Sequence, residues 1–225
     1  MFMIESIETL IRLIELLIRL KIMKYRSICI AGVDGTGKST TIDLIRQQMG
    51  EENICVQYMG ARKWETKNAL KYIGDEASPK GLKFKLVVMG AYSRIYEMYH
   101  RIYKHNGSGK IVVFDRYANE QALFRRAGSK GMYGRVMSFI YSIFLLWLFP
   151  KPDITFYLKC SIDASISRKS DINTKEEIEG LKRNKRLLDK YYENRKNVYI
   201  LDTSKESQQI IAQRIIEIVN KTFKL

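Results

Sequence analysis

The most informative segment of the sequence is Gly32-Val33-Asp34-Gly35-Thr36-Gly37-Lys38-Ser39. It matches the pattern of glycine, any four residues, glycine, lysine, and then serine or threonine. The apolar run at residues 27–31 precedes it and a helical pattern follows it, which is the context this pattern needs. Chance would place the pattern in a chain of this length on the order of once in a hundred sequences. The stretch therefore predicts a loop that holds nucleotide phosphates.

The chemistry of such a loop follows from its residue types. Glycines let its N–H groups face a phosphate, and the start of the following helix adds its positive end. Lys38 is expected to reach the β- and γ-phosphate oxygens, and Ser39 to bind Mg²⁺. The alternative is a glycine-rich turn with a surface lysine. The residues expected to bind ATP are Gly32, Val33, Asp34, Gly35, Thr36, Gly37, Lys38, Ser39 and Thr40.

Short apolar runs alternate with helical patterns along the rest of the chain. The runs expected to form strands are 27–31, 54–58, 111–114, 154–158 and 198–201. This alternation, together with the loop, predicts an α/β fold, the P-loop NTPase three-layer sandwich, with a five-stranded parallel sheet and helices on both faces. Ligands of such sheets lie beyond the carboxyl ends of the strands. The turns after Ala31, Phe114 and Leu158 are therefore the places where a site is expected.

One of these turns carries a carboxylate and a guanidinium side by side. Asp115 and Arg116 follow the third apolar run directly. Asp115 is expected to hold Mg²⁺ together with Ser39, and the planar fork of Arg116 suits a substrate phosphate. The alternative is a helix-capping aspartate with a solvated arginine. The pair favours phosphoryl transfer, with Lys38, Asp115 and Arg116 as catalytic candidates.

Composition limits the remaining classes of protein. The chain has 225 residues, which suits one domain, and 39 Lys and Arg against 24 Asp and Glu give a net charge of +15. The basic residues are scattered and no nucleic-acid motif accompanies them, so direct nucleic-acid binding is not expected. The cysteines Cys29, Cys55 and Cys160 show no metal or disulfide spacing and are expected to be reduced, in a cytoplasmic protein.

Two apolar segments could be mistaken for membrane spans. Residues 1–22 form an amphipathic pattern with a narrow charged stripe. This helix is expected to pack on the domain or on a second subunit, with a membrane-surface role or a natural start at Met23 as alternatives. The domain boundaries are thus 1–22 and 23–225. Residues 136–149 are uncharged but too short to span a bilayer, so a buried helix is expected there.

The motifs together resemble the thymidylate kinase family. The loop from Val33 to Thr40, the triplet Asp115-Arg116-Tyr117 and the strand pattern from Pro152 to Leu158 carry the resemblance, over about residues 24–222. The resemblance implies an acceptor nucleotide whose sugar touches Asp34 and whose phosphate touches Arg116. The acceptor contacts that it implies are Asp34, Arg62, Arg94, Arg116 and Tyr117.

The resemblance also implies a short lid and shows departures from the family. No variable position of the loop is basic, so a cation that clamps the transferring phosphoryl group must come from the lid. Arg168 is the catalytic candidate there, with Lys169, Lys175 and Arg186 as further ones. Gly90 stands where the family usually has an aromatic that stacks on thymine, which predicts weak discrimination among pyrimidines. Glu120 stands where the family usually has a small hydroxyl residue.

The expected activity is ATP- and Mg²⁺-dependent phosphorylation of a nucleoside monophosphate, most simply dTMP to dTDP. One alternative is a kinase of the same fold that acts on a sugar, a glycan intermediate or a nucleoside. Another is an ATP-binding regulator without catalysis. The expected partners are ATP, a small phosphorylated acceptor and a second copy in a homodimer, with possible peripheral membrane contact through residues 1–22.

Overall fold

The structure is a computed structural model that describes residues 25–59, 107–128, 131–143, 151–169 and 174–225, together with Ile11, Glu15 and Ile18. Its centre is a five-stranded, all-parallel sheet with the strand order β2-β3-β1-β4-β5. The strands are β1 (Arg26–Ala31), β2 (Ile54–Tyr58), β3 (Ile111–Asp115), β4 (Ile154–Lys159) and β5 (Val198–Asp202). All five predicted strands are confirmed, each within a residue of its predicted ends.

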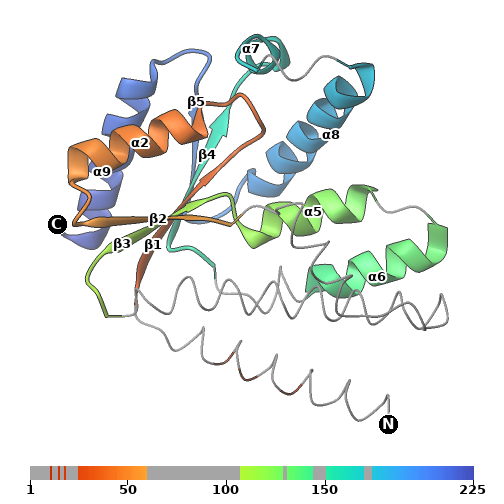
Figure 1. Cartoon of the computed structure of the whole chain (residues 1–225), viewed down its shortest axis with the longest axis horizontal. Coiled ribbons are helices and arrows are strands. Elements are labelled where there is room, and N and C mark those ends of the chain that lie inside the picture. The colour runs from red at the N-terminus through yellow and green to blue at the C-terminus, as the bar shows by residue number, and fades with distance from the viewer. Residues whose placement is uncertain are drawn as a thin grey trace, which may run out of the picture.

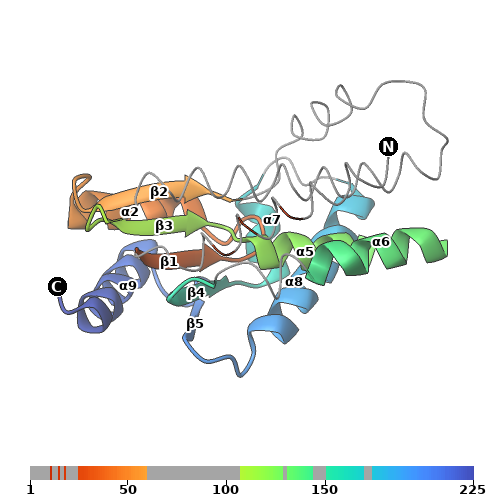
Figure 2. The ribbon, with the colours of Figure 1, turned by 90° about the horizontal axis from the view of Figure 1, so that it is seen from below.

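Helices cover both faces of the sheet, as the α/β prediction requires (Figures 1 and 2). The helices are α2 (Lys38–Met49), α5 (Ala118–Gly128), α6 (Gly131–Ile143), α7 (Ile162–Ser167), α8 (Lys175–Tyr192) and α9 (Gln208–Phe223). Alternate residues of β1 face opposite layers: Ile28 and Ile30 pack in the core with α2 and α9, and Cys29 and Ala31 in the core with α5 and α8. Burial on both faces explains why the central strands β1, β3 and β4 are nearly continuous apolar runs, whereas the edge strands β2 and β5 are partly exposed.

The strand order places the site. β1 lies at the centre of the sheet between β3 and β4, so the loop after β1 and the turn after β3 emerge side by side at one edge. The register pairs Ile30 with Asp115, which brings the carboxyl end of β3 level with the start of the loop after Ala31. The sheet therefore delivers Asp115 and Arg116 next to Lys38, as the sequence pattern predicted.

Helix α6 corrects one prediction. Residues 136–149 were expected to form a buried helix, but Val136 and Phe139 are each 51% exposed and Ser138 and Ser142 face inward instead. The Ser142 hydroxyl donates to the Ala122 carbonyl of α5 at 3.4 Å. At this close approach of α5 and α6 a small side chain makes the contact, and the large side chains of Val136, Phe139 and Ile143 lie at the surface. Residues 144–149 lie outside the described residues.

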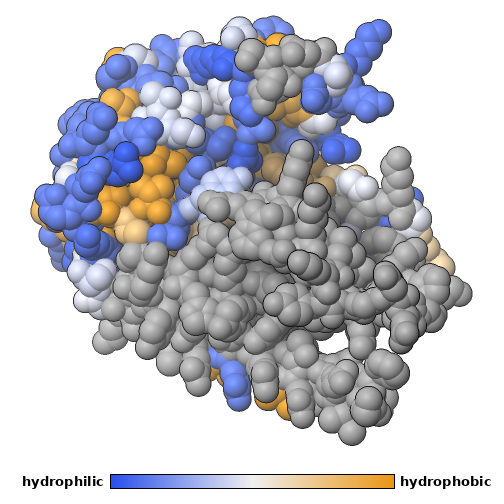
Figure 3. Space-filling view, in the orientation of Figure 1, coloured by the Kyte–Doolittle hydropathy of each residue, from blue (hydrophilic) through white to orange (hydrophobic). Residues whose placement is uncertain are grey.

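The other predictions on non-site segments have mixed outcomes. The helix expected over residues 1–22 lies outside the described residues, except for Ile11, Glu15 and Ile18, which are exposed. Cys29 and Cys160 are buried, and none of the three cysteines forms a disulfide bond within the described part of the chain. Among the residues described, no helix is long and apolar enough to cross a membrane. Hydrophilic side chains predominate over the described part of the face in Figure 3, around smaller apolar areas.

Candidate active site

The loop between β1 and α2 has the backbone of a phosphate cradle. Gly35 and Gly37 adopt left-handed φ values of 79° and 84°. A Cβ on Gly35 would also collide with the backbone of Ser165, so the position needs glycine for two reasons. Helix α2 begins directly after Gly37, and this N-cap residue has no side chain that could accept a hydrogen bond from the first turn of the helix. The first N–H groups of α2 therefore remain available to an anion.

Lys38 lies almost wholly inside this cradle. Its side chain is 7% exposed, and its ammonium group donates to the Val33 carbonyl at 2.7 Å. Burial, and then the nearby charge of Arg116, lower the pKa of Lys38 to about 8. A cation held in a water-poor site interacts strongly with charge that develops beside it. Lys38 is thus placed to stabilise phosphate oxygens.

Asp115 and Ser39 present oxygen ligands at the same place. Both line the larger of two cavities at this edge of the sheet, which has a volume of about 610 Å³. Oδ1 of Asp115 is buried and has no hydrogen-bond partner among the described residues, and burial raises the pKa of this carboxyl. A carboxylate and a hydroxyl suit Mg²⁺, which binds few protein ligands alongside phosphate oxygens. The residues present therefore fit a magnesium ion.

Arg116 stands at the junction of the site in an unusual backbone conformation. Its φ of 66° is left-handed, which is costly for a residue with a side chain and persists only where the surrounding contacts hold it. Its guanidinium group forms an ion pair with Asp34 and lies 3.6 Å from Oε2 of Glu120. Burial opposes the charge, but Glu120 and Asp34 raise the pKa of Arg116 above its usual value. Arg116 is therefore a fixed cation.

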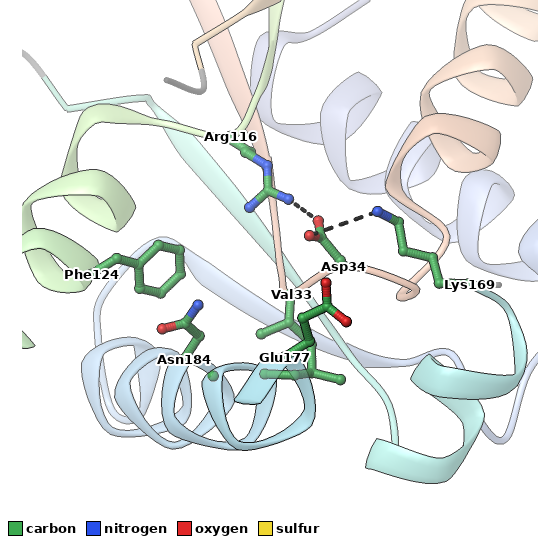
Figure 4. A pocket seen from close by; sticks show the side chains of 9 residues that line it. Val33, Asp34, Arg116, Phe124, Lys169, Glu177 and Asn184 are labelled. Atoms are coloured by element: carbon green, nitrogen blue, oxygen red, sulfur yellow. Dashed lines mark hydrogen bonds and ion pairs between the residues drawn. The ribbon is translucent and has the colours of Figure 1, made fainter. Parts of the chain in front are cut away.

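A second cavity, of about 270 Å³, opens on the other side of Arg116 (Figure 4). Asp34 and Arg116 line this cavity and the larger one alike. Phe124 of α5 and Asn184 of α8 form the wall away from the loop. Oδ1 of Asn184 is buried and unpartnered within the described part of the chain. The smaller cavity thus offers an apolar ring and an amide next to a cation.

Lid residues reach the site from the end of α7. The Arg168 guanidinium donates to the Thr203 carbonyl at 2.9 Å and, at 3.5 Å, to the Gly35 carbonyl. Lys169 lies 3.8 Å from the Asp34 carboxylate. Both line the larger cavity. Lys175 and Arg186, the other candidates, are exposed on α8 and line neither of the two cavities.

Of the other predicted acceptor residues, Tyr117 alone is described. It is 3% exposed and packs against Phe114, with ring centroids 4.9 Å apart, because the turn after β3 directs it into the core. It lines neither of the two cavities, and its acceptor contact stays a prediction. Arg62, Arg94 and Gly90 lie outside the described residues.

Sequence reasoning did not name Phe124 or Asn184 as site residues. Phe124 follows Glu120 by one turn of α5, so the helical spacing alone could have placed these two side chains on one face of the helix. Asn184 comes from α8, which only the tertiary fold brings to the cavity. No local pattern in the sequence marks it.

The comparisons with known proteins agree with this geometry. The family model described as thymidylate kinase matches residues 30–215, which includes the loop, Asp115, Arg116 and the lid. The chain belongs to the thymidylate kinase family. It is a P-loop kinase that transfers a phosphoryl group from ATP to a nucleoside monophosphate.

Individual relatives support the same assignment. The probable thymidylate kinase 1 of Saccharolobus solfataricus is 27% identical over 192 residues, which cover 84% of this chain and 94% of that protein. Among solved structures, thymidylate kinase from Candida albicans matches with a TM-score of 0.61 and 17% identity, over 88% of this chain and 92% of that one. Deoxyadenosine kinase from M. mycoides, with dCMP and dCDP bound, gives a TM-score of 0.58 and 20% identity, over 87% and 99%. At these identities the two structures show the shared fold.

Proposed function

We propose that this thymidylate kinase family member transfers the γ-phosphoryl group of ATP to the phosphate of dTMP, at the border between its two cavities. The observation that carries the proposal is the position of Arg116, which lines both cavities together with Asp34. A cation at such a border can hold one phosphate while a second phosphate approaches it. Phosphoryl transfer requires this alignment of donor and acceptor.

The larger cavity suits the donor. It contains the start of α2, the Lys38 ammonium group and the hydroxyl of Ser39. The N–H groups and Lys38 hold the β- and γ-phosphates, and Lys38 stabilises the charge on the equatorial oxygens during transfer. An oxygen of the acceptor phosphate forms the new bond to the γ-phosphorus, the bond to the β–γ bridging oxygen breaks, and ADP leaves.

Ser39 and Asp115 would hold the Mg²⁺ that accompanies ATP. The ion would neutralise phosphate charge and orient the donor. Oδ1 of Asp115, which is buried and has no hydrogen-bond partner in the described part of the chain, supports this assignment, because such an atom is costly to leave without a partner. The lid cations Arg168 and Lys169 complete the larger cavity and exclude water from the transferring group.

The smaller cavity suits the nucleoside part of the acceptor. With the acceptor phosphate on Arg116, the sugar lies beside Asp34 and the ring extends toward Phe124 and Asn184 (Figure 4). Phe124 supplies apolar contact, and the amide of Asn184 can both donate to and accept from a base or a sugar hydroxyl. This arrangement offers an aromatic contact that does not depend on position 90.

An acceptor screen tests the proposal. ATP turnover should be stimulated by dTMP, with a preference over dUMP and dCMP of no more than about 200-fold, as is typical of a pocket that separates ligands mainly by apolar fit. The measurement is kcat/KM for dTMP, dUMP, dCMP, thymidine and a sugar phosphate with labelled ATP. Phosphorylation of thymidine or the sugar phosphate without phosphorylation of dTMP would assign a different acceptor.

The smaller cavity gives a second prediction. Asn184→Leu should lower kcat/KM for dTMP about tenfold, because it removes a hydrogen bond of roughly 1 kcal/mol and leaves a polar ligand atom unpaired. It should leave the KM for ATP within twofold. Lys182→Leu, an exposed position one half-turn earlier on α8, is the control. An equal loss in both variants would mean that α8 contributes only to stability.

A further inference from the structure

Glu120 is a buried carboxyl group that the mechanism above does not use. It lies in the first turn of α5 with 1% of its surface exposed. Glutamate is rarely this buried unless it is paired. Its surroundings should therefore show what holds it there.

The two oxygens of Glu120 point to two different parts of the site. Oε1 accepts a hydrogen bond of 3.2 Å from the N–H of Gly32, the first residue of the phosphate-binding loop. Oε2 lies 3.6 Å from the guanidinium of Arg116 and makes no hydrogen bond in the described part of the chain. One side chain thus connects the donor loop with the acceptor arginine. It also commits the Gly32 N–H, which is therefore no longer free to bind ATP.

Burial of this carboxyl group has an electrostatic cost. Burial raises the pKa of Glu120 to about 7, even though Arg116 and Lys38 favour its ionised form. The contact with Arg116 and the hydrogen bond from the Gly32 N–H are the interactions that offset this cost. The titratable and charged groups that face it are Cys29 of β1, Lys38 of α2, Asp115 and Arg116 at the end of β3, Tyr157 of β4 and Tyr192 of α8.

Solvent exposure of the side chains increases from Glu120 through Arg116 to Asp34. The side chain of Glu120 is 1% exposed, that of Arg116 is 19% exposed and that of Asp34 is 46% exposed. An anion that enters from solvent therefore meets Arg116 on the Asp34 side. It can compete with Asp34 for the guanidinium, whereas Glu120 stays in contact from the buried side.

We propose that Glu120 is a positioning residue for the acceptor phosphate, which fixes the guanidinium of Arg116 from behind and ties it to the phosphate-binding loop through Gly32. This inference rests on the proposed role of Arg116 in binding the acceptor. A fixed guanidinium loses less side-chain freedom when the phosphate binds, so the effect falls on acceptor affinity.

Glu120→Gln tests the role with little change of shape, because the amide oxygen can still accept from the Gly32 N–H. The acceptor KM should rise about tenfold and the ATP KM should stay within twofold. Glu179→Gln, at an exposed position on α8, should change neither value. The assay uses the full chain with ATP, Mg²⁺ and dTMP, or with whichever monophosphate the acceptor screen identifies.

A double-mutant cycle separates positioning from a general structural effect. In an Arg116→Ala background, Glu120→Gln should change the acceptor KM less than threefold, since the group that it positions is gone. An unchanged acceptor KM in Glu120→Gln, an equal rise in both KM values, or a full tenfold effect without Arg116 would each overturn the proposal. If the glutamine variant fails to unfold cooperatively, Glu120→Ser replaces it in the test. This variant must then raise the acceptor KM and leave the ATP KM within twofold. If the wild-type enzyme phosphorylates dTMP and one of these results is found, the role of Glu120 is rejected and the proposed function stands.

Discussion

Replacing Lys38 with alanine is expected to lower kcat about 10³-fold and to leave the fold intact. The loss is large because Lys38 is the buried cation nearest the transferring phosphate, and removal of one preorganised charge at such a site costs this much. The fold should survive because burial lowers the pKa of Lys38, so the native state gains little from its charge. The measurement is a single-turnover assay with labelled ATP beside a thermal unfolding curve.

The control for this variant is Lys182→Ala, which removes an exposed lysine paired with Glu179. It should retain full activity. If a folded Lys38→Ala enzyme kept more than a tenth of the wild-type rate, the loop would not be the donor site. A variant that no longer unfolds cooperatively would instead make Lys38 a structural residue.

The same lysine gives the reaction a pH dependence with a defined sign. A group whose pKa is about 8 is charged below that pH and neutral above it. The pH dependence of kcat/KM reports pKa values of the free enzyme. Because only the charged form of Lys38 stabilises the phosphoryl group, kcat/KM for ATP should fall as the pH rises through about 8. This alkaline limb should be absent from Lys38→Ala.

The sheet was predictable because its sequence signals are local. Each strand is an apolar run of four or five residues bounded by turn residues, and this short length separates it from a buried helix. Helix α6 was not predictable in the same way. Its apolar composition favoured burial, yet Ser142 makes the contact with Ala122 while Val136 and Phe139 are half exposed, and only the packing of two helices determines that orientation.

The site residues likewise fall into those that the sequence alone could place and those that it could not. Lys38 and Ser39 begin α2 after the loop that leaves β1, and Asp115 and Arg116 stand at the end of β3. The order of residues along the chain was therefore enough to place them at one edge. The Asn184 side chain reaches its cavity through the position of α8, which no local pattern encodes. The sequence marked Glu120 only because the family usually has a small hydroxyl residue at that position. Its contacts with Gly32 and Arg116 became known only from the three-dimensional structure.

Arg116→Ala should lower kcat/KM for the acceptor roughly 10²-fold or more, with the ATP KM changed less than threefold. The guanidinium is a charged group held by carboxylates on two sides, and loss of a charge-assisted phosphate contact at a mostly buried position has an effect of this size. Arg116→Lys should recover little of the loss. A single ammonium group cannot contact Asp34, Glu120 and a phosphate with the geometry of a planar fork.

Steady-state kinetics with each substrate varied in turn decide the assignment. Arg46→Ala is the matched control, because Arg46 is a half-exposed arginine in the last turn of α2, at the opposite end of that helix from the site. If the ATP KM rose in Arg116→Ala and the acceptor KM did not move, Arg116 would belong to the donor site. If lysine restored full acceptor use, a point charge would suffice, and the fixed orientation that Glu120 is proposed to provide would have no role in catalysis.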